Sequence, residues 1–159
     1  MDKLNQICNY LLIGPDLGTA GQPGPGQFAA LRAAGYELVV NLAMPTSTGA
    51  LPDEAGLVAA QGMEYVAIPV VWEAPALADL ERFFDVMERA RGRKVFVHCA
   101  LNMRVSVFVF LYRVLRLGVP PDVARETMHR IWQPDSVWAA FVDDALARHG
   151  LAPASSDNA

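Results

Sequence analysis

The sequence predicts an α/β protein in which a mostly parallel sheet is flanked by helices. Short apolar runs typical of strands alternate along the chain with longer segments that carry apolar residues near helical spacing. The composition, 53% hydrophobic and 19% charged, is that of a globular protein with a sizeable core. Alternation of strands and helices is typical of sheets that are covered by helices on both faces.

The length of 159 residues favours a single domain, which we place at residues 1–150. Residues 151–159 are small and polar and are expected to form a disordered tail. The net charge of -4 argues against nucleic-acid binding. The chain shows no secretory signal, and its very apolar run at Val105–Leu111 is too short to span a membrane. We therefore expect a cytoplasmic protein, and the abundance of Ala, Gly, Pro and Arg favours a bacterial source.

The N-terminal half contains three predicted strands. Tyr10–Gly14 is a short first strand, and a turn cluster and a short helix that ends at Gly35 follow it. Glu37–Leu42 reads as a buried strand. After a polar loop, Pro52 opens a small-residue helix that ends at Gly62, and Glu64–Val70 forms the next strand.

The C-terminal half is mostly helical. A helix is expected from about Pro75 to Arg91, with apolar residues near helical spacing, and Lys94–His98 is the strand that follows it. A long apolar helix over Val105–Leu117 comes next. Two further helices are predicted, the first from the prolines at 120–121 to about Trp132 and the last, after Pro134, to about His149.

The stretch His98–Ser106 joins the predicted strand to the apolar helix and carries the chemistry. A cysteine at such a turn lies beneath backbone amides and the positive end of a helix, and both lower a thiol pKa and bind anions. Arg104 can donate two hydrogen bonds to the oxygens of a phosphoryl group. Cys99 is therefore the candidate nucleophile.

This stretch resembles the phosphate loop of the cysteine-dependent tyrosine and dual-specificity phosphatases, His-Cys-x5-Arg-Ser/Thr. Segments on both sides resemble compact bacterial members of that family in the same order, so the resemblance covers roughly residues 10–145. These segments are Gln22-Pro23, Phe28–Leu31, Gly35, Val39–Leu42, Gly62–Tyr65, Ile68–Val70, Arg130–Pro134, Trp138 and Phe141. The resemblance implies a three-layer protein-tyrosine-phosphatase-like sandwich and no metal or organic cofactor.

The loop departs from the family pattern because only four residues separate Cys99 from Arg104. Either the loop has lost one residue, or its length is unchanged and the arginine stands one position early. We prefer the second, because Asn102 then replaces a glycine and Ser106 keeps its place. Asparagine tolerates a left-handed backbone better than most residues. A shift of one position near the start of a helix rotates a side chain by about 100° around the helix axis. Arg104 must therefore reach an anion along a different path.

The second departure concerns the general acid, since Trp72 stands where the family has an aspartate. Glu73 and Asp79 are the candidate acids that remain. Ser106 is expected to assist the thiolate or the hydrolysis of a phosphoenzyme. The resemblance implies that the loop binds the phosphoryl group, with contributions from His98, Ala100, Leu101, Asn102, Met103, Arg104 and Val105.

Three functions remain open from the sequence. The first is hydrolysis of phosphomonoesters, phosphotyrosine or a related phosphoester, through a phosphocysteine. The second is a weak or inactive relative that binds a phosphorylated ligand. The third is sulfur transfer or redox chemistry at Cys99, because a thiol in an amide cradle also suits a persulfide. The expected partner is a phosphorylated protein or a small phosphoester.

Overall fold

A five-stranded sheet forms the centre of the molecule in the computed structural model, which describes residues 3–151. The strand order is β1-β2-β5-β3-β4. β2, β5, β3 and β4 run parallel, and β1 pairs with β2 in the antiparallel sense. The strands are β1 (Leu11–Gly14), β2 (Leu17–Ala20), β3 (Leu38–Asn41), β4 (Glu64–Ala67) and β5 (Val95–His98). The predicted mostly parallel sheet is confirmed.

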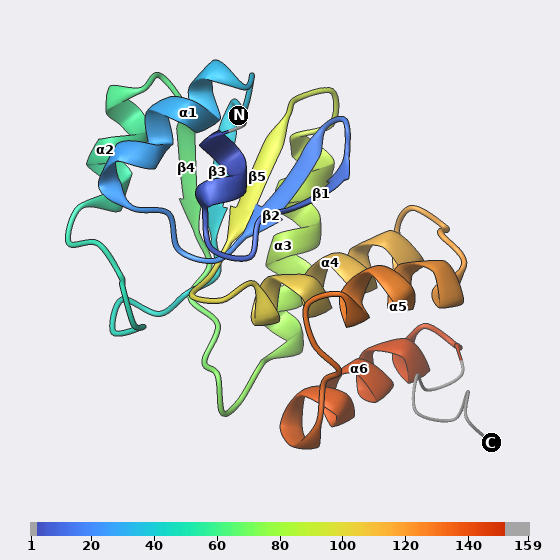
Figure 1. Cartoon of the computed structure of the whole chain (residues 1–159). Coiled ribbons are helices and arrows are strands. Elements are labelled where there is room, and N and C mark those ends of the chain that lie inside the picture. Colours follow the sequence, from blue (N-terminus) through green and yellow to red (C-terminus); the bar gives the residue numbers. More distant parts are fainter. Residues whose placement is uncertain (1–2, 152–159) are drawn as a thin grey trace.

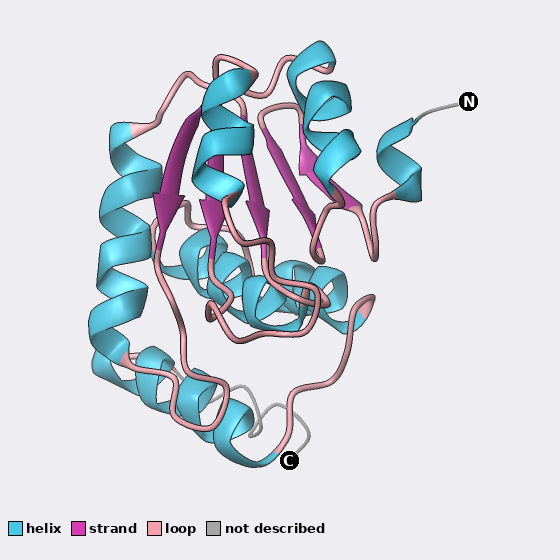
Figure 2. Ribbon diagram, turned by 90° about the vertical axis from the view of Figure 1, so that its left-hand side faces the viewer, coloured by secondary structure: helices cyan, strands magenta, loops and turns pink. Residues whose placement is uncertain are grey.

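Helices cover both faces of this sheet and complete three layers (Figures 1 and 2). One face carries η1 (Lys3–Gln6), η2 (Pro25–Gln27), α1 (Phe28–Ala33) and α2 (Glu54–Ala60). The other carries α3 (Leu77–Arg89), α4 (Met103–Leu115), α5 (Pro121–His129) and α6 (Ser136–Arg148). The α/β sandwich predicted from the sequence is therefore the observed fold.

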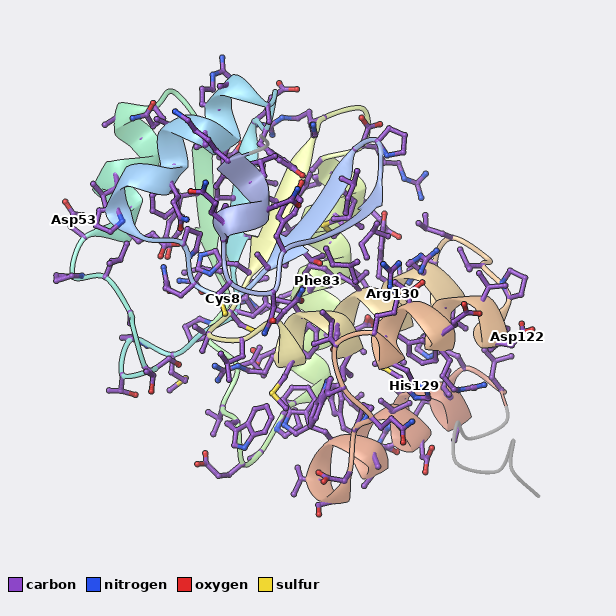
Figure 3. All side chains as sticks on the ribbon, viewed as in Figure 1. Cys8, Asp53, Phe83, Asp122, His129 and Arg130 are labelled. Carbon is purple, nitrogen blue, oxygen red and sulfur yellow. The ribbon has the colours of Figure 1, made fainter. Side chains whose placement is uncertain are left out.

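The central strands β3 and β5 are buried on both faces, and the alternation of their side chains divides the core in two. Val39 and Phe96 pack against α1 and α2, whereas Val40 and Val97 pack against α3 and α4. Successive residues of a strand point to opposite faces, which is why neighbours in one strand belong to different clusters. The labelled Phe83 on α3 belongs to the larger cluster (Figure 3). The two central strands thus hold both helical layers together.

The strand β2 and the short helix η1 are elements that the sequence did not predict. The sequence of β2, Leu-Gly-Thr-Ala, carries neither a run of β-branched residues nor an apolar alternation. Gly18 lies where a Cβ would stand 1.9 Å from the Tyr36 hydroxyl, so the tyrosine ring occupies the space of a side chain. The strand forms because β5 pairs with it from Leu17↔Val95 to Ala20↔His98.

Other boundaries shift by a few residues. The predicted strand to Val70 ends at Ala67, yet Ile68 and Val70 still donate to the carbonyls of Asn41 and Leu42, at 2.9 and 3.0 Å. The helix predicted from Pro52 begins at Glu54, because the Asp53 carboxylate accepts from the Gly56 amide and caps it. The predicted tail lies outside the described residues except for Leu151. Within residues 3–151, none of the helices has the length and hydropathy needed to span a bilayer.

Candidate anion-binding site at Cys99

Cys99 follows the last residue of β5, the central strand of the sheet, at the edge where the parallel strands end. Its side chain is 1% exposed. Ligands of open α/β sheets bind beyond the carboxyl ends of the strands. The chain then makes a short turn over residues 99–102 and enters α4 at Met103. The cysteine therefore lies beneath the N-terminus of a thirteen-residue helix.

The backbone amides of this turn have no acceptors in the described part of the chain. None of the N–H groups of residues 100–105 donates to a described carbonyl or side chain, whereas the next amide, that of Ser106, donates to the Asn102 carbonyl at 2.9 Å. Amides that gather at a helix start without partners form a binding site for an anion. These are the residues at which the sequence predicts an anion-binding loop.

Two carbonyls of the same turn accept hydrogen bonds from the N-terminal part of the chain. The Ala100 carbonyl accepts from the Gln22 amide at 3.0 Å, and the Leu101 carbonyl accepts from the Asn9 side chain at 3.0 Å. Cys8, labelled in Figure 3, lies on the same N-terminal segment at this end of the sheet. With its carbonyls engaged, the turn keeps its amides available for a ligand.

Asn102 is the N-cap of α4 and has a left-handed backbone, with φ 71° and ψ 3°. This is the conformation that the sequence analysis expected of the residue in a glycine position. The side chain, fully buried, donates to the Asn9 carbonyl at 2.9 Å and to the Thr19 hydroxyl at 3.1 Å. These bonds favour the left-handed conformation over the alternatives open to an asparagine.

A pocket of about 260 Å³ opens over the cysteine. Three segments supply its walls: the turn and the start of α4, the loop after β3, and the loop before α3. The lining residues are Ser47, Thr48, Trp72, Cys99, Ala100, Leu101, Met103 and Arg104. Arg104 is the single charged residue among them, and none of these described residues is a carboxylate. The pocket therefore suits an anion whose remaining surface is small or apolar.

Arg104 lines this pocket although it stands one position earlier in the sequence than the arginine of the family pattern. The side chain is 6% exposed, and its terminal nitrogens donate to the Val70 carbonyl at 3.1 Å and to the Ser47 hydroxyl at 3.3 Å. The guanidinium carbon lies 5.8 Å from the centre of the Trp72 ring. The Nε–H is buried and has no described partner. A buried donor without an acceptor is costly, so this group is poised to bind an anion.

His98 lies below the pocket and pairs with a residue that the sequence analysis missed. Its Nε2 is 2.5 Å from the Glu54 carboxylate, and its Nδ1 is 3.2 Å from the Cys99 carbonyl. Both side chains are buried, at 0% and 4% exposure. The other Glu54 oxygen accepts from Gln22 at 2.7 Å. A glutamate in the first turn of a helix is ordinary, so nothing in the sequence marked Glu54.

Structures of other proteins decide the family. The crystal structure of a DUF442 protein from Shewanella putrefaciens CN-32, named as a putative phosphatase, shares 35% sequence identity with this chain. The alignment covers 92% of this chain and 96% of that one, with a TM-score of 0.84. The chain belongs to the DUF442 family of phosphatase-like proteins. No family model matches the sequence, and no curated protein does.

More distantly related proteins of known structure share the fold of this chain. Tk-PTP in its active form has a TM-score of 0.70 at 19% identity, and covers 89% of this chain and 95% of its own. TpbA of P. aeruginosa has a TM-score of 0.66 at 20% identity, and covers 90% and 84%. The protein-tyrosine-phosphatase-like sandwich expected from the sequence is therefore confirmed.

The pocket brings together part of the residue set that the sequence analysis named. Cys99, Ala100, Leu101, Met103 and Arg104 line it. The side chains of three others point elsewhere: His98 toward Glu54, Asn102 toward Asn9 and Thr19, and Val105 into the core. The amides of Asn102 and Val105 are still among those that have no described acceptor.

The remaining three candidates do not join the pocket of this DUF442 protein. The Ser106 hydroxyl donates to the Met103 carbonyl at 2.7 Å. Glu73 is exposed next to Trp72 in the loop before α3. The Asp79 carboxylate lies 3.6 Å from Arg82 on the first turns of α3. No described contact joins any of these three side chains to the thiol.

Three tryptophans support the wall of the pocket. The Trp72 ring lies 5.5 Å from both Trp132 and Trp138, measured between ring centres. Trp138 donates to the Trp72 carbonyl at 2.9 Å, and Trp132 donates to the Met103 carbonyl at 3.1 Å. The cluster therefore joins the loop before α3, the start of α4 and the start of α6.

Proposed function

We propose that this DUF442 protein hydrolyses phosphomonoesters through a covalent intermediate on Cys99. The observation that carries the proposal is the set of amides over residues 100–105 that have no described acceptor, next to a buried cysteine and the Arg104 Nε–H, which also has no described partner. Membership of a phosphatase-like family supports it.

The reaction has two steps. The Cys99 sulfur attacks phosphorus, a sulfur–phosphorus bond forms, and the bond to the ester oxygen breaks. Water then attacks the phosphocysteine, so that inorganic phosphate leaves and the thiolate is regenerated. The amides and Arg104 donate to the phosphoryl oxygens, where negative charge is spread in the transition state. Each step uses groups that line the pocket and needs no redox partner.

The described pocket has no general acid to protonate the leaving group. None of the described pocket residues carries a carboxyl group that could protonate an ester oxygen. A phenolate leaves without that help more readily than an alkoxide. We therefore expect aryl phosphates, including phosphotyrosine, to be hydrolysed faster than alkyl phosphates. TpbA, which shares the fold, has been crystallised with phosphotyrosine.

Turnover of p-nitrophenyl phosphate tests the proposal. The wild-type protein should release p-nitrophenol, Cys99→Ser should release none, and Arg104→Lys should lose about 100-fold in kcat/KM, since one fixed oxyanion donor contributes this much. Wild-type protein that binds inorganic phosphate without turnover would instead indicate a binding protein. Turnover that persists in Cys99→Ser would refute the mechanism.

Sulfur transfer is the second candidate, and the absence of a carboxylate among the described pocket residues favours it. The thiolate would attack the outer sulfur of thiosulfate, form a sulfur–sulfur bond and release sulfite. Sulfite leaves as an anion and needs no proton from an acid. Incubation with thiosulfate, followed by intact-mass measurement, should then show one added sulfur atom in the wild type and none in Cys99→Ser.

The expected partner is a phosphorylated protein or a small phosphoester, and we place the reaction in the cytoplasm. The described pocket offers one cation. A ligand with several phosphates would need more basic side chains than these walls supply. Assays on singly phosphorylated peptides and on small aryl phosphates compare these two classes directly.

A further inference from the structure

The hydroxyl of Ser106, which the family pattern places at the nucleophile, is committed to other groups. It donates to the Met103 carbonyl at 2.7 Å and accepts from the Trp132 indole at 2.9 Å. Its single proton is therefore used within the first turn of α4. Ser106 therefore has no proton left to donate to an anion over Cys99.

Two residues with hydroxyl groups line the pocket, Ser47 and Thr48, and of these Ser47 contacts Arg104. Ser47, on the loop between β3 and α2, lines the same cavity as Cys99 and Arg104. Its oxygen accepts from the Met44 amide at 3.0 Å and from an Arg104 terminal nitrogen at 3.3 Å. The residue comes from a loop that is distant in sequence from the cysteine, so local sequence motifs do not reveal it.

The Ser47 hydroxyl still has a proton to donate. A serine hydroxyl has two lone pairs and one proton. Donors from Met44 and Arg104 occupy both lone pairs, and no described group accepts the proton. The turn itself is fixed, because the Ser47 amide donates to the Met44 carbonyl at 2.9 Å and the Ser47 carbonyl accepts from Ala50 at 3.0 Å. The free O–H thus belongs to a well-held residue at the pocket wall.

We propose that Ser47 is a substrate-binding residue: its O–H donates to an oxygen of the anion over Cys99, while its oxygen holds Arg104 in place. The proposal rests on the proposed anion chemistry of the site and names a contact that this chemistry would use. It applies equally to a phosphoryl group and to thiosulfate, which share tetrahedral oxyanion geometry. Ser47 also explains how an arginine one position early is kept at the pocket.

Calorimetric titration with inorganic phosphate tests this role without requiring turnover. Ser47→Ala should weaken phosphate binding about tenfold or more, because a hydrogen bond to a charged group is lost. Ser47→Thr keeps the hydroxyl and should restore most of the affinity. Thr46→Ala, an exposed position in the same loop and outside the pocket lining, is the matched control and should bind as the wild type does.

The two proposals fail in different ways. If the wild type binds neither phosphate nor thiosulfate, the anion site itself is wrong. If the wild type binds phosphate and Ser47→Ala binds it equally well, with an unchanged melting temperature, the role of Ser47 is overturned. Loss of affinity in Ser47→Ala at unchanged melting temperature, with recovery in Ser47→Thr, supports it.

Discussion

At the scale of single residues, Glu54 and His98 form a buried pair next to Cys99, whose carbonyl lies 3.2 Å from the His98 Nδ1. Removing one member leaves the other buried without its partner, which costs about 3–5 kcal/mol. Glu54→Ala should therefore lower the free energy of unfolding by about 3 kcal/mol, and Glu54→Gln, which keeps a hydrogen-bonding oxygen, by less. Urea denaturation measures both.

Glu64→Gln is the control for this prediction. Glu64 pairs with Arg93 at 2.9 Å, but its side chain is 56% exposed, and exposed pairs contribute about 0–1 kcal/mol. An equal loss of stability in the Glu64 and Glu54 variants would show that the buried pair has no special structural role.

Tyr65 is expected to make the free energy of unfolding depend on pH in the alkaline range. Burial raises the pKa of its phenol above the usual 10.0 and the charge of Glu54 adds to this, while a hydrogen bond from Asn41 lowers it. Because the folded state holds the proton more tightly, the stabilisation is complete below about pH 10 and is lost as pH rises through the folded pKa. Tyr65→Phe should remove this part of the pH dependence of the unfolding free energy. An unchanged alkaline slope in that variant would contradict the assignment.

At the scale of elements, the backbone at Gly21, directly after β2, lies close against the cysteine turn. A Cβ on Gly21 would stand 2.5 Å from the Ala100 carbonyl oxygen, which is backbone and must move if the side chain grows. We predict that Gly21→Ala displaces the cradle, weakens phosphate binding at least tenfold and lowers the melting temperature. Calorimetric titration and thermal unfolding check both effects.

Gly26→Ala is the matched control, because a Cβ there meets no atom within 4 Å. It should leave phosphate affinity and melting temperature within the error of the wild type. If Gly21→Ala also behaves as the wild type, the cradle tolerates movement that this account excludes.

The elements also show what the sequence could predict. The helical spacing of apolar residues sufficed to predict α3, and a continuous apolar run sufficed for β5, whose four residues are all buried. The left-handed turn at Asn102 was predictable from the residue type together with its place at a glycine position of the family pattern. The strand β2 was not, since its four residues form a strand through pairing with β1 and β5 rather than through a pattern of their own. Ser47 and Glu54 were missed for the same reason: their partners, Arg104 and His98, are distant in sequence.

At the scale of the whole molecule, the two core clusters share the strands β3 and β5. Neither helical layer can detach without exposing residues of those strands, so we expect residues 1–150 to unfold as one domain. The three tryptophans lie on the α3–α6 side, whereas far-UV circular dichroism reports on all helices. The two signals should give the same urea midpoint. Two separated transitions would show that the layers are independent units.

The central claim of the account is that the turn at Cys99 is built to hold a tetrahedral oxyanion. A crystal structure of the protein grown or soaked with phosphate tests it most directly. We expect a phosphate bound over the cysteine sulfur, with oxygens within hydrogen-bond distance of the amides of residues 100–105 and of the Arg104 Nε. An empty pocket at saturating phosphate, or a phosphate bound away from Cys99 with these amides unused, would contradict it.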